Sequence, residues 1–374
     1  MKKTLLTICL VWMCFSLSAQ KIIDLSGKWS FSIDRQDNGE KEKWFSHTLN
    51  DFINLPGSMP EKLKGDEVTA KTQWTGSLYD SSYYYNPYME KYRKEGNIKF
   101  PFFLTPDKHY VGAAWYQKEV NIPADWKGER ILLFLERPHI ETTVWVNGQK
   151  TGMQNSLCVP HQYDITHYVR PGKCTITIRV DNRIKEINVG PDSHSITDQT
   201  QGNWNGIVGR ICLQTTPKTY FDDIQIYPEP EQKLARVKVV IKGAGITKIK
   251  LSAESFNTDK KHIVPAIQQE IKLNKGVTET EMVLPMGNDM LLWDEFHPAL
   301  YKLKAEVTNG KKTEIKEIQF GMRRFEIKGK WFYVNGRKTQ LRGTVENCDF
   351  PLTGYAPMDV ESWERVFRIC RSYG

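Results

Sequence analysis

Alternation of apolar and polar residues dominates the first half of the chain. Residues 24–31 alternate in this way, with Trp29 and Phe31 on one face. The pattern recurs in four further segments, residues 115–120, 131–135, 142–146 and 175–180. A period of two places every second side chain on one face of a strand, so these segments predict short β-strands with a buried face. Short strands separated by turn residues at this spacing are typical of a β-sandwich.

A second β-rich region runs from about residue 220 to residue 321. Its alternating segments are residues 236–241, 248–251, 271–273 and 301–307. Roughly a hundred residues with this pattern match the size of an immunoglobulin-like sandwich. Two Asn-Gly pairs, Asn147-Gly148 and Asn335-Gly336, follow strand segments and predict tight two-residue hairpins, because Asn and Gly accept the positive φ angles of such a turn.

The pattern changes near the C-terminus. Residues 339–345 predict one more strand, and Asp359 is placed to cap a following helix. The apolar residues of that helix fall three or four positions apart: Val360, Trp363, Val366, Phe367, Cys370 and Tyr373. A strand followed by a helix is one unit of a β/α domain, and one unit cannot close a parallel sheet. We therefore expect the chain to be a fragment, or a truncated product, of a longer protein.

Composition fits a mainly β, globular protein of several domains. The chain has 374 residues, of which 40% are hydrophobic and 26% charged, and its 11 Trp, 16 Tyr, 16 Phe, 18 Pro and 26 Gly favour short strands and turns. The formal net charge is +8, with basic residues scattered among acidic ones. Such a distribution indicates a solvated surface rather than a nucleic-acid-binding stripe, so no nucleic acid partner is predicted.

The N-terminus has the pattern of a secretory signal peptide. Lys2 and Lys3 precede an apolar run over residues 5–15, and small residues end at Ala19. We expect residues 1–19 to be removed and the protein to be periplasmic or secreted. No other stretch is long and apolar enough for a membrane span.

Five cysteines remain after such cleavage. They are Cys158, Cys174, Cys212, Cys348 and Cys370, and none has the spacing of a zinc site. Buried thiols, with at most a single disulfide among them, are the expectation. The chain also lacks a dinucleotide-binding loop and a nucleophile elbow, so no metal or cofactor is predicted.

Nine short motifs follow one another along the chain, at residues 25–29, 114–118, 144–148, 204–211, 292–293, 298–301, 320–323, 334–336 and 341–343. In this order they resemble glycoside hydrolase family 2, which includes β-galactosidases, β-glucuronidases and β-mannosidases. The resemblance covers the whole mature chain. It implies a jelly-roll sugar-binding domain over residues 20–218, an immunoglobulin-like sandwich over 219–321 and the start of a TIM barrel over 322–374.

The resemblance also implies the chemistry. Family members hydrolyse β-glycosidic bonds with retention, which requires two carboxylates about 5 to 5.5 Å apart. Both catalytic Glu residues of the family come from later barrel strands, so none is assigned here and both are expected beyond Gly374. The family often has a His where Asn347 aligns, although Arg342-Gly343 and the Pro351 to Gly354 motif match. This difference argues against galactose specificity.

Two groups of residues are predicted to bind the sugar. Glu346, Asn347 and Asp349 directly follow the first predicted barrel strand, where side chains of a TIM barrel face the pocket. The loop over residues 195–203 aligns with a jelly-roll loop that reaches the barrel mouth in some family members. It holds polar side chains suited to sugar hydroxyls, namely Asp198, Gln199, Gln201 and Asn203. The alternative for both groups is a solvated surface loop, and Trp204 is predicted to lie in the core.

An aromatic stretch between Trp74 and Tyr110 has three interpretations. It contains Tyr79, Tyr83, Tyr84, Tyr85, Tyr88, Tyr92, Phe100, Phe102 and Phe103. Such rings suit the apolar faces of sugars and also protein interfaces. The preferred interpretation is an insertion that folds back on its own aromatic residues.

Two functions follow from these observations. The first is an exported glycosidase of family 2 that acts on a β-glycoside substrate in carbohydrate metabolism, present here without its catalytic carboxylates. The alternative is a non-catalytic carbohydrate-binding or adhesion protein in which the sandwich domains are the whole function. The sugar, the linkage and the oligomeric state stay open.

Overall fold

A computed structural model describes residues 21–78, 80–185, 192–343, 345–346 and 350–373. The predicted signal peptide over residues 1–19 and the candidate residues Asn347 and Asp349 lie outside the described residues. The chain divides into two compact units. We call Ile22–Thr215 together with Thr344–Gly374 the jelly-roll unit, and Thr216–Gly343 the immunoglobulin-like unit.

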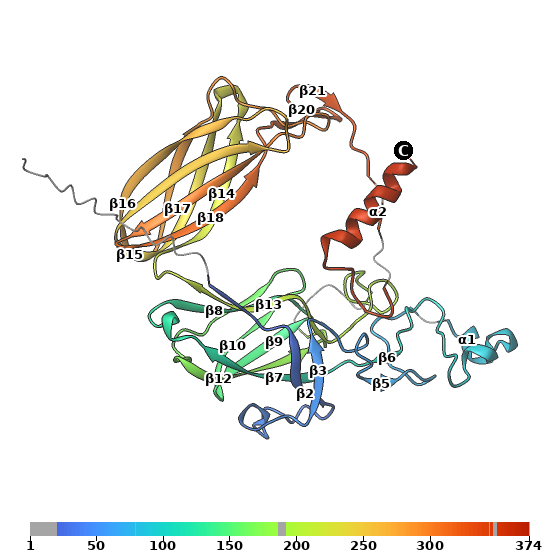
Figure 1. Ribbon diagram of the computed structural model, residues 1–374. Helices are drawn as coiled ribbons and strands as arrows, with labels where there is room; N and C mark the ends of the chain where they lie inside the picture. The colour runs from blue at the N-terminus through green and yellow to red at the C-terminus, as the bar shows by residue number, and fades with distance from the viewer. Residues whose placement is uncertain (1–20, 79, 186–191, 344, 347–349, 374) are drawn as a thin grey trace, which may run out of the picture. The chain divides into compact units, whose positions relative to one another are not determined.

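The jelly-roll unit contains a six-stranded antiparallel sheet. Its strand order is β10 (Gln149–Asn155), β9 (Glu141–Val146), β12 (Gly172–Asp181), β7 (Ala113–Ile122), β2 (Gly27–Asp34) and β3 (Asp51–Leu55). Long strands lie at the centre of this sheet, where β12 pairs with both β7 and β9 (Figure 1). The predicted strands over residues 115–120, 142–146 and 175–180 are therefore confirmed, and the one predicted over residues 24–31 is confirmed from Gly27 onward.

A second sheet packs against the first to form a sandwich. It contains β1 (Ile22–Asp24), β13 (Gly206–Thr216), β8 (Arg130–Pro138) and β11 (His161–Asp164), and β4 (Gly57–Ser58) pairs with β13. One hydrophobic core joins residues of both sheets, among them Trp29, Phe31, Tyr116, Leu133 and Ile211. Trp29 and Phe31 are buried on the same face of β2, as their spacing predicts.

The first Asn-Gly hairpin forms as predicted. Asn147 and Gly148 connect β9 and β10 with φ angles of 50° and 76°. Positive φ at both central residues is the signature of a type I′ turn. Two short 3₁₀ helices also belong to this unit, η1 (Trp44–Ser46) and η3 (Ala124–Trp126).

The aromatic stretch forms an insertion between β4 and β7. It holds β5 (Asp66–Glu67), β6 (Lys108–His109), the short helix α1 (Ser82–Tyr85) and η2 (Pro87–Tyr92). Tyr83 is fully buried, donates a 2.8 Å hydrogen bond from its hydroxyl to the Tyr92 carbonyl, and packs 4.7 Å from the Phe100 ring. The insertion therefore folds on its own aromatic residues, as preferred from the sequence, while Tyr85 and Tyr88 remain exposed.

The immunoglobulin-like unit is built around two long strands. Its elements are β14 (Tyr220–Glu229), η4 (Pro230–Gln232), β15 (Leu234–Phe256), β16 (Ile263–Pro285), β17 (Leu300–Asn309) and β18 (Lys312–Phe320). The first half of β15 pairs with β14 and its second half with β17, while β16 pairs along both halves. Side chains of both halves contribute to one core, including Val237, Ile249 and Leu303.

The prediction of separate strands over residues 236–241 and 248–251 was wrong, because both belong to β15. Register shifts lie between Gly243 and Gly245 of this strand, so the chain bends there without ending its pairing with β16. Gly243 has a φ of 155°, and a Cβ on it would lie 2.6 Å from the Thr219 hydroxyl oxygen. The absence of a side chain is what lets the strand continue through the bend.

A small three-stranded sheet ends this unit. It consists of β19 (Phe325–Lys328), β20 (Trp331–Val334) and β21 (Arg337–Thr339). The second Asn-Gly hairpin is confirmed, with φ angles of 50° at Asn335 and 78° at Gly336. The strand predicted over residues 339–345 was wrong, because β21 ends at Thr339 and the described residues beyond it, up to Glu346, form no strand. A parallel strand takes its hydrogen bonds from neighbouring strands, and the described part of the chain places none beside this segment.

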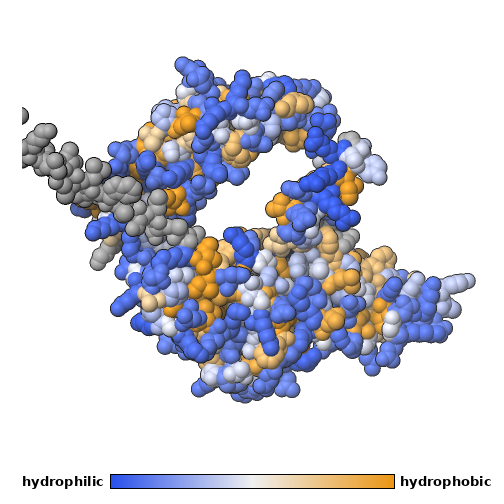
Figure 2. Space-filling view, viewed as in Figure 1, coloured by the Kyte–Doolittle hydropathy of each residue, from blue (hydrophilic) through white to orange (hydrophobic). Residues whose placement is uncertain are grey.

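The predicted C-terminal helix is present as α2 (Val360–Ser372), in the jelly-roll unit. The Asp359 carboxylate caps it by accepting a 2.7 Å hydrogen bond from the Ser362 backbone N–H. None of its described residues is buried, and Val360 and Phe367 are 74% and 62% exposed. Figure 2 shows that hydrophilic residues dominate the visible face of the molecule and that apolar residues form small separate groups on it.

The described cysteines are free thiols. Cys174 and Cys212 are buried and Cys158 and Cys370 are exposed, whereas Cys348 lies outside the described residues. Burial raises the pKa of the Cys174 thiol to about 11, so it stays protonated near neutral pH. No helix among the described residues is both long and apolar enough to cross a membrane.

Candidate functional site

Residues that closely follow each of the two regions predicted to bind sugar meet within the jelly-roll unit, and Glu346 itself takes no part in these contacts. The loop before β13 and the segment before α2 come together at Trp204 and Tyr355, whose ring centroids are 5.5 Å apart. An ideal Cβ on Gly202 would lie 3.7 Å from the Cα of Gly354, so the two backbones also approach closely. Tertiary structure thus joins two stretches that are far apart in the sequence.

Hydrogen bonds fix the segment before α2 to the jelly roll. The Ser58 hydroxyl donates to the Thr353 carbonyl, and the Tyr355 hydroxyl donates a 2.8 Å hydrogen bond to the Glu61 carboxylate. Burial acts to raise the pKa of Glu61, but hydrogen bonds from Lys62 and Tyr355 outweigh it and hold the pKa below its usual value. Glu61 is therefore ionised near neutral pH and stays an acceptor for Tyr355.

Close packing at Trp204 requires glycine at position 354. Gly354 has a φ of 80°, and a Cβ there would lie 2.9 Å from the Trp204 side chain. This φ lies in the left-handed region that disfavours other residues, and the space is already filled. The Pro-x-x-Gly motif noted in the sequence therefore ends in a residue that the packing itself demands.

Trp204 also contacts a buried histidine. The rings of Trp204 and His139 are 4.6 Å apart and inclined by 15°, and both residues are 2% exposed. Burial, helped by the nearby charge of Arg137, lowers the pKa of His139 to about 3. His139 is thus a neutral ring stacked on Trp204, and the prediction that Trp204 is a core residue is confirmed.

Asp198 lies inside the unit and ties three segments together. The side chain is 2% exposed and accepts hydrogen bonds from the backbone N–H groups of Thr75 at 2.8 Å and Asn203 at 2.7 Å. Its second carboxylate oxygen also lies 3.1 Å from the His109 ring nitrogen Nε2. Its acceptors are occupied by protein donors, so the geometry makes Asp198 a residue that positions the loop. Direct contact of Asp198 with a sugar stays a prediction that this arrangement does not favour.

Asn203 is held in the same way. Its amide nitrogen donates to the Thr75 hydroxyl at 2.9 Å and to the Asn182 carbonyl at 3.1 Å, and its oxygen accepts from the Asn182 amide at 3.0 Å. Sequence reasoning missed Asn182, which directly follows β12 and also accepts from the Gly112 backbone N–H at 2.8 Å. Its position after a long strand was the available signal. Direct sugar binding by Asn203 likewise stays a prediction.

The other candidates lie nearer the surface or outside the described part. Glu346 is exposed and has an interaction partner, whereas Asn347 and Asp349 fall outside the described residues. Gln199 is half-buried, and its side-chain oxygen is buried without a hydrogen-bond partner in the described structure. Within the predicted loop set, that oxygen is a buried acceptor to which the described residues donate no hydrogen bond.

A cavity of about 550 Å³ lies between the jelly-roll strands and the segment before α2. It is lined by Pro56, Glu136, Gly209, Arg210, Phe350, Thr353, Tyr355, Pro357, Met358, Asp359 and Ser362. Its size falls within the roughly 300 to 1,000 Å³ typical of ligand pockets. Arg210 donates hydrogen bonds to the Glu136 carboxylate. These bonds are the main reason that the pKa of Glu136 lies below its usual value. The cavity therefore combines an ion pair with aromatic surface from Phe350 and Tyr355.

Comparison with known protein families identifies the family of this chain. Residues 22–217, more than half of the chain, match the sugar-binding domain of glycosyl hydrolases family 2. The chain belongs to glycosyl hydrolase family 2. Residues 219–323 match a second domain of the same family, in the order that the sequence motifs indicated.

Curated family 2 relatives extend over a greater length than this chain. A β-galactosidase of Thermoanaerobacter pseudethanolicus is 25% identical over 281 residues, covering 70% of this chain and 35% of the relative. The human β-glucuronidase is 23% identical over 369 residues, covering 88% of this chain and 49% of the relative. The chain therefore spans between about a third and a half of the length of these relatives.

Solved structures share the fold. A structure of the Ruminococcus gnavus β-glucuronidase in complex with D-glucaro-d-lactam superposes with a TM-score of 0.64 at 19% identity. The match covers 94% of this chain and 53% of that protein. The mainly β architecture of family 2, with a jelly-roll sandwich followed by an immunoglobulin-like one, is therefore shared. Among the described residues, no group of His, Cys, Asp or Glu side chains is arranged to hold a metal ion.

Proposed function

We propose that this chain carries the accessory domains, and the opening of the catalytic domain, of an exported family 2 enzyme that hydrolyses β-glycosidic bonds. Family membership supports this proposal, as do relatives named β-glucuronidase and β-galactosidase. The reaction would proceed with retention through two carboxylates about 5 to 5.5 Å apart, one acting as nucleophile and the other as acid and then base. Both carboxylates are proposed to come from barrel strands that follow the described segment.

The contact between Trp204 and Tyr355 carries the proposal. Loops at one end of a barrel form the active site of TIM-barrel enzymes, and the segment before α2 is the proposed first such loop. The jelly roll fixes this segment through Tyr355, Gly354 and Thr353. Asp198 and Asn203 then act as positioning residues, since they hold the loop that ends at Trp204. Positioning of this kind affects rate because reacting groups must be held in a narrow geometry.

The alternative function is a non-catalytic carbohydrate-binding or adhesion protein. In such a protein the two sandwiches would bind the carbohydrate by themselves. Hydrogen bonds between the jelly roll and the segment before α2 would then serve no purpose in binding. The observed bonds between Ser58 and Thr353 and between Glu61 and Tyr355 therefore favour the enzyme.

Hydrolysis by the complete gene product tests the proposal. The protein is incubated with aryl β-glucuronide, β-galactoside, β-mannoside and β-glucoside, and release of the aryl group is followed. We expect turnover of at least one substrate, and a lower kcat in a Tyr355→Ala variant than in a Tyr88→Ala variant, because Tyr88 is 86% exposed. Sugar binding without turnover of any substrate would support the non-catalytic alternative instead.

Export is tested separately from activity. Mass spectrometry of the protein recovered from the periplasm or medium of a bacterial host should find a mature N-terminus at Gln20. Recovery with Met1 retained would contradict the proposed export.

A further inference from the structure

The outer face of the six-stranded sheet carries an aromatic cluster that is separate from the main core. Trp115 on β7 and Trp145 on β9 point away from that core, yet they are 0% and 2% exposed. The segment containing η1 covers them, and its Phe45 ring stacks on Trp145 at 5.2 Å with an interplanar angle of 6°. The Trp44 ring lies 6.1 Å from Trp115. The covering segment is therefore anchored by aromatic stacking.

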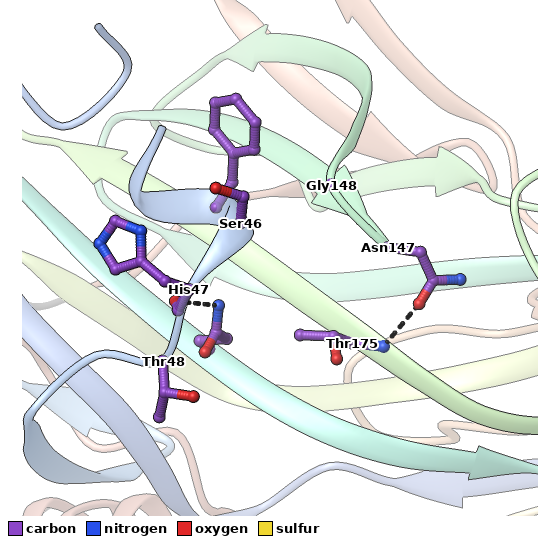
Figure 3. Close-up of a pocket in the computed structure, with 8 residues that line it drawn as sticks. Ser46, His47, Thr48, Asn147, Gly148 and Thr175 are labelled. Carbon is purple, nitrogen blue, oxygen red and sulfur yellow. Dashed lines mark hydrogen bonds between the residues drawn. The ribbon is translucent and has the colours of Figure 1, made fainter. Parts of the chain in front are cut away.

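A pocket of about 280 Å³ opens where this cover ends. It is lined by Phe45, Ser46, His47, Thr48, Gln117, Asn147, Gly148 and Thr175. Figure 3 shows His47 and Thr48 on the covering segment, with Asn147 and Thr175 across from them on the sheet side. The pocket thus has one wall from a loop and one from the strands and the Asn147-Gly148 turn.

Hydrogen bonds hold both walls in place. The Gln117 amide is 8% exposed and donates to the His47 carbonyl at 3.2 Å and to the Thr177 hydroxyl at 3.1 Å. Across the pocket, the Asn147 oxygen accepts from the Thr175 backbone N–H at 2.9 Å, and the Asn147 amide donates to the Tyr168 carbonyl at 3.2 Å. The pocket is therefore a preformed feature rather than a gap between unrelated loops.

The lining leaves polar groups for a ligand. The Gln117 side-chain oxygen and the hydroxyls of Thr48 and Thr175 take part in none of the hydrogen bonds of the described residues. Amide and hydroxyl groups both accept and donate, which is the pattern that sugar hydroxyls need. Phe45 adds an aromatic surface suited to the C–H face of a sugar ring.

The charge of the lining residues and the volume of the pocket indicate which class of ligand it could bind. None of the eight lining residues is Asp, Glu, Lys or Arg. An anionic ligand such as a uronate or a phosphate is normally held by Arg or Lys side chains, and neither lines this pocket. The volume lies just below the roughly 300 Å³ at which pockets for drug-sized ligands begin, so it suits one sugar ring.

The pocket is also remote from the Trp204 site. Thr175 lies near the start of β12, whereas Asp181 ends that strand and the next residue, Asn182, is hydrogen-bonded to Asn203. A strand rises about 3.3 Å per residue, so residues 175 to 181 of β12 span about 20 Å. A ligand in the pocket would therefore leave the Trp204 site free.

We propose that this pocket is a second, non-catalytic site that binds one neutral pyranose ring of a glycan. It goes beyond the proposed function, because binding here requires no hydrolysis. A weak site of this kind raises the local concentration of a polymeric substrate at the enzyme through a second point of attachment. With few hydrogen bonds and an open mouth, the affinity for a single sugar is in the millimolar range.

Protein-observed NMR titration of this chain tests the proposal. The probes are methyl β-D-glucopyranoside, methyl β-D-galactopyranoside and glucuronic acid. The test variant is the double substitution Thr48→Val with Thr175→Val, which removes the two hydroxyls that the described residues leave free in the pocket, without touching the Trp204 site. Thr278→Val in β16 is the matched control, since Thr278 is also a half-buried strand threonine.

We expect saturable binding of a neutral glycoside. Its affinity should fall about tenfold or more in the double variant and stay unchanged in the control. A tenfold change corresponds to about 1.4 kcal/mol of lost hydrogen bonding. Glucuronic acid should bind no more tightly than the neutral glycosides. Equal affinities in wild type and double variant, tighter binding of glucuronic acid, or no binding of either neutral glycoside to the folded chain would overturn the proposal. Circular dichroism establishes that each variant is folded. Because the readout is binding alone, its failure is distinct from an absence of glycosidase activity.

Discussion

The rings of Trp204 and Tyr355 lie 5.5 Å apart at an interplanar angle of 50°, and this contact joins the jelly-roll loop to the segment that precedes α2. Trp204 is also stacked on its other neighbour, His139, at 4.6 Å. One buried indole ring therefore links a jelly-roll loop, a strand end and the segment before the C-terminal helix.

Removing the Tyr355 side chain should loosen the segment before α2. Tyr355→Phe loses only the hydrogen bond to Glu61, and we expect the free energy of unfolding to fall by about 1 kcal/mol. Tyr355→Ala also loses packing against Trp204, and a loss of about 2 to 3 kcal/mol is expected for a half-buried aromatic residue. Urea unfolding measures both values. Tyr88→Ala is the control at an 86% exposed site, and equal losses in the two alanine variants would contradict the role of Tyr355.

Alanine at position 354 should be more costly than at another glycine with positive φ. Gly354 and Gly329 have φ angles of 80° and 60°, so alanine at either position carries a conformational cost of about 1 to 2 kcal/mol. Only at Gly354 would the new Cβ meet the Trp204 side chain, at 2.9 Å, whereas nothing lies within 4 Å at Gly329. We expect Gly354→Ala to lower the free energy of unfolding by about 1 to 3 kcal/mol more than Gly329→Ala does. Similar values for the two variants would mean that the segment moves away from Trp204 without cost.

Asp198 should prove to be a stabilising residue. Asp198→Ala leaves the backbone N–H groups of half-buried Thr75 and buried Asn203 without acceptors, and each such loss costs about 1 to 3 kcal/mol. Asp198→Asn retains one acceptor oxygen, so its effect should be roughly half as large. Chemical denaturation of both variants beside the exposed control Asp259→Ala gives the comparison. Wild-type stability in Asp198→Ala together with a loss of sugar affinity would instead show that Asp198 contacts the sugar directly.

The jelly-roll unit should lose stability in mild acid because of His139. Its pKa falls from an ordinary 6.5 to about 3 on folding, since burial disfavours the charged ring. The unfolded chain thus binds a proton more readily, so the stabilisation is complete above about pH 6.5 and is lost as the pH falls toward 3. One such group changes the free energy of unfolding by about 1.4 kcal/mol per pH unit within this range.

A His139→Phe variant isolates this contribution, because phenylalanine preserves a ring beside Trp204 and does not titrate. The dependence of unfolding free energy on pH between 4 and 6 should become shallower by about 1.4 kcal/mol per pH unit. His161, whose pKa burial lowers to about 4, accounts for a further part of the acid sensitivity in both proteins. An unaltered slope in His139→Phe would show that His139 is not held neutral.

Local patterns were sufficient for the long central strands of the six-stranded sheet, whereas long strands such as β13, β14 and β18 were not predicted. Alternation identified β2, β7, β9 and β12, because burial of one face requires a period of two wherever a strand covers a core. The same rule failed for β15, where a glycine-bearing bend interrupts the pattern while the pairing continues. It also failed beyond Thr339, because a strand needs a neighbour as well as a pattern.

For the site, residue type was informative but did not settle the role. Asp198 and Asn203 were singled out as polar residues of a loop, and the fold instead fills their hydrogen-bonding groups with Thr75 and Asn182. No local signal relates these residues to one another, since three separate segments bring them together.

The sequence by itself therefore determined the mainly β architecture, the two Asn-Gly hairpins, the capped C-terminal helix and the family, because each depends on short-range pattern or motif order. Tertiary structure alone decided that Trp204 meets Tyr355, that Asp198 is enclosed and that a polar pocket opens beside Gln117. These features depend on which distant segments pack together. Packing of that kind is selected by the shape and burial of the whole unit, which no local window of residues contains.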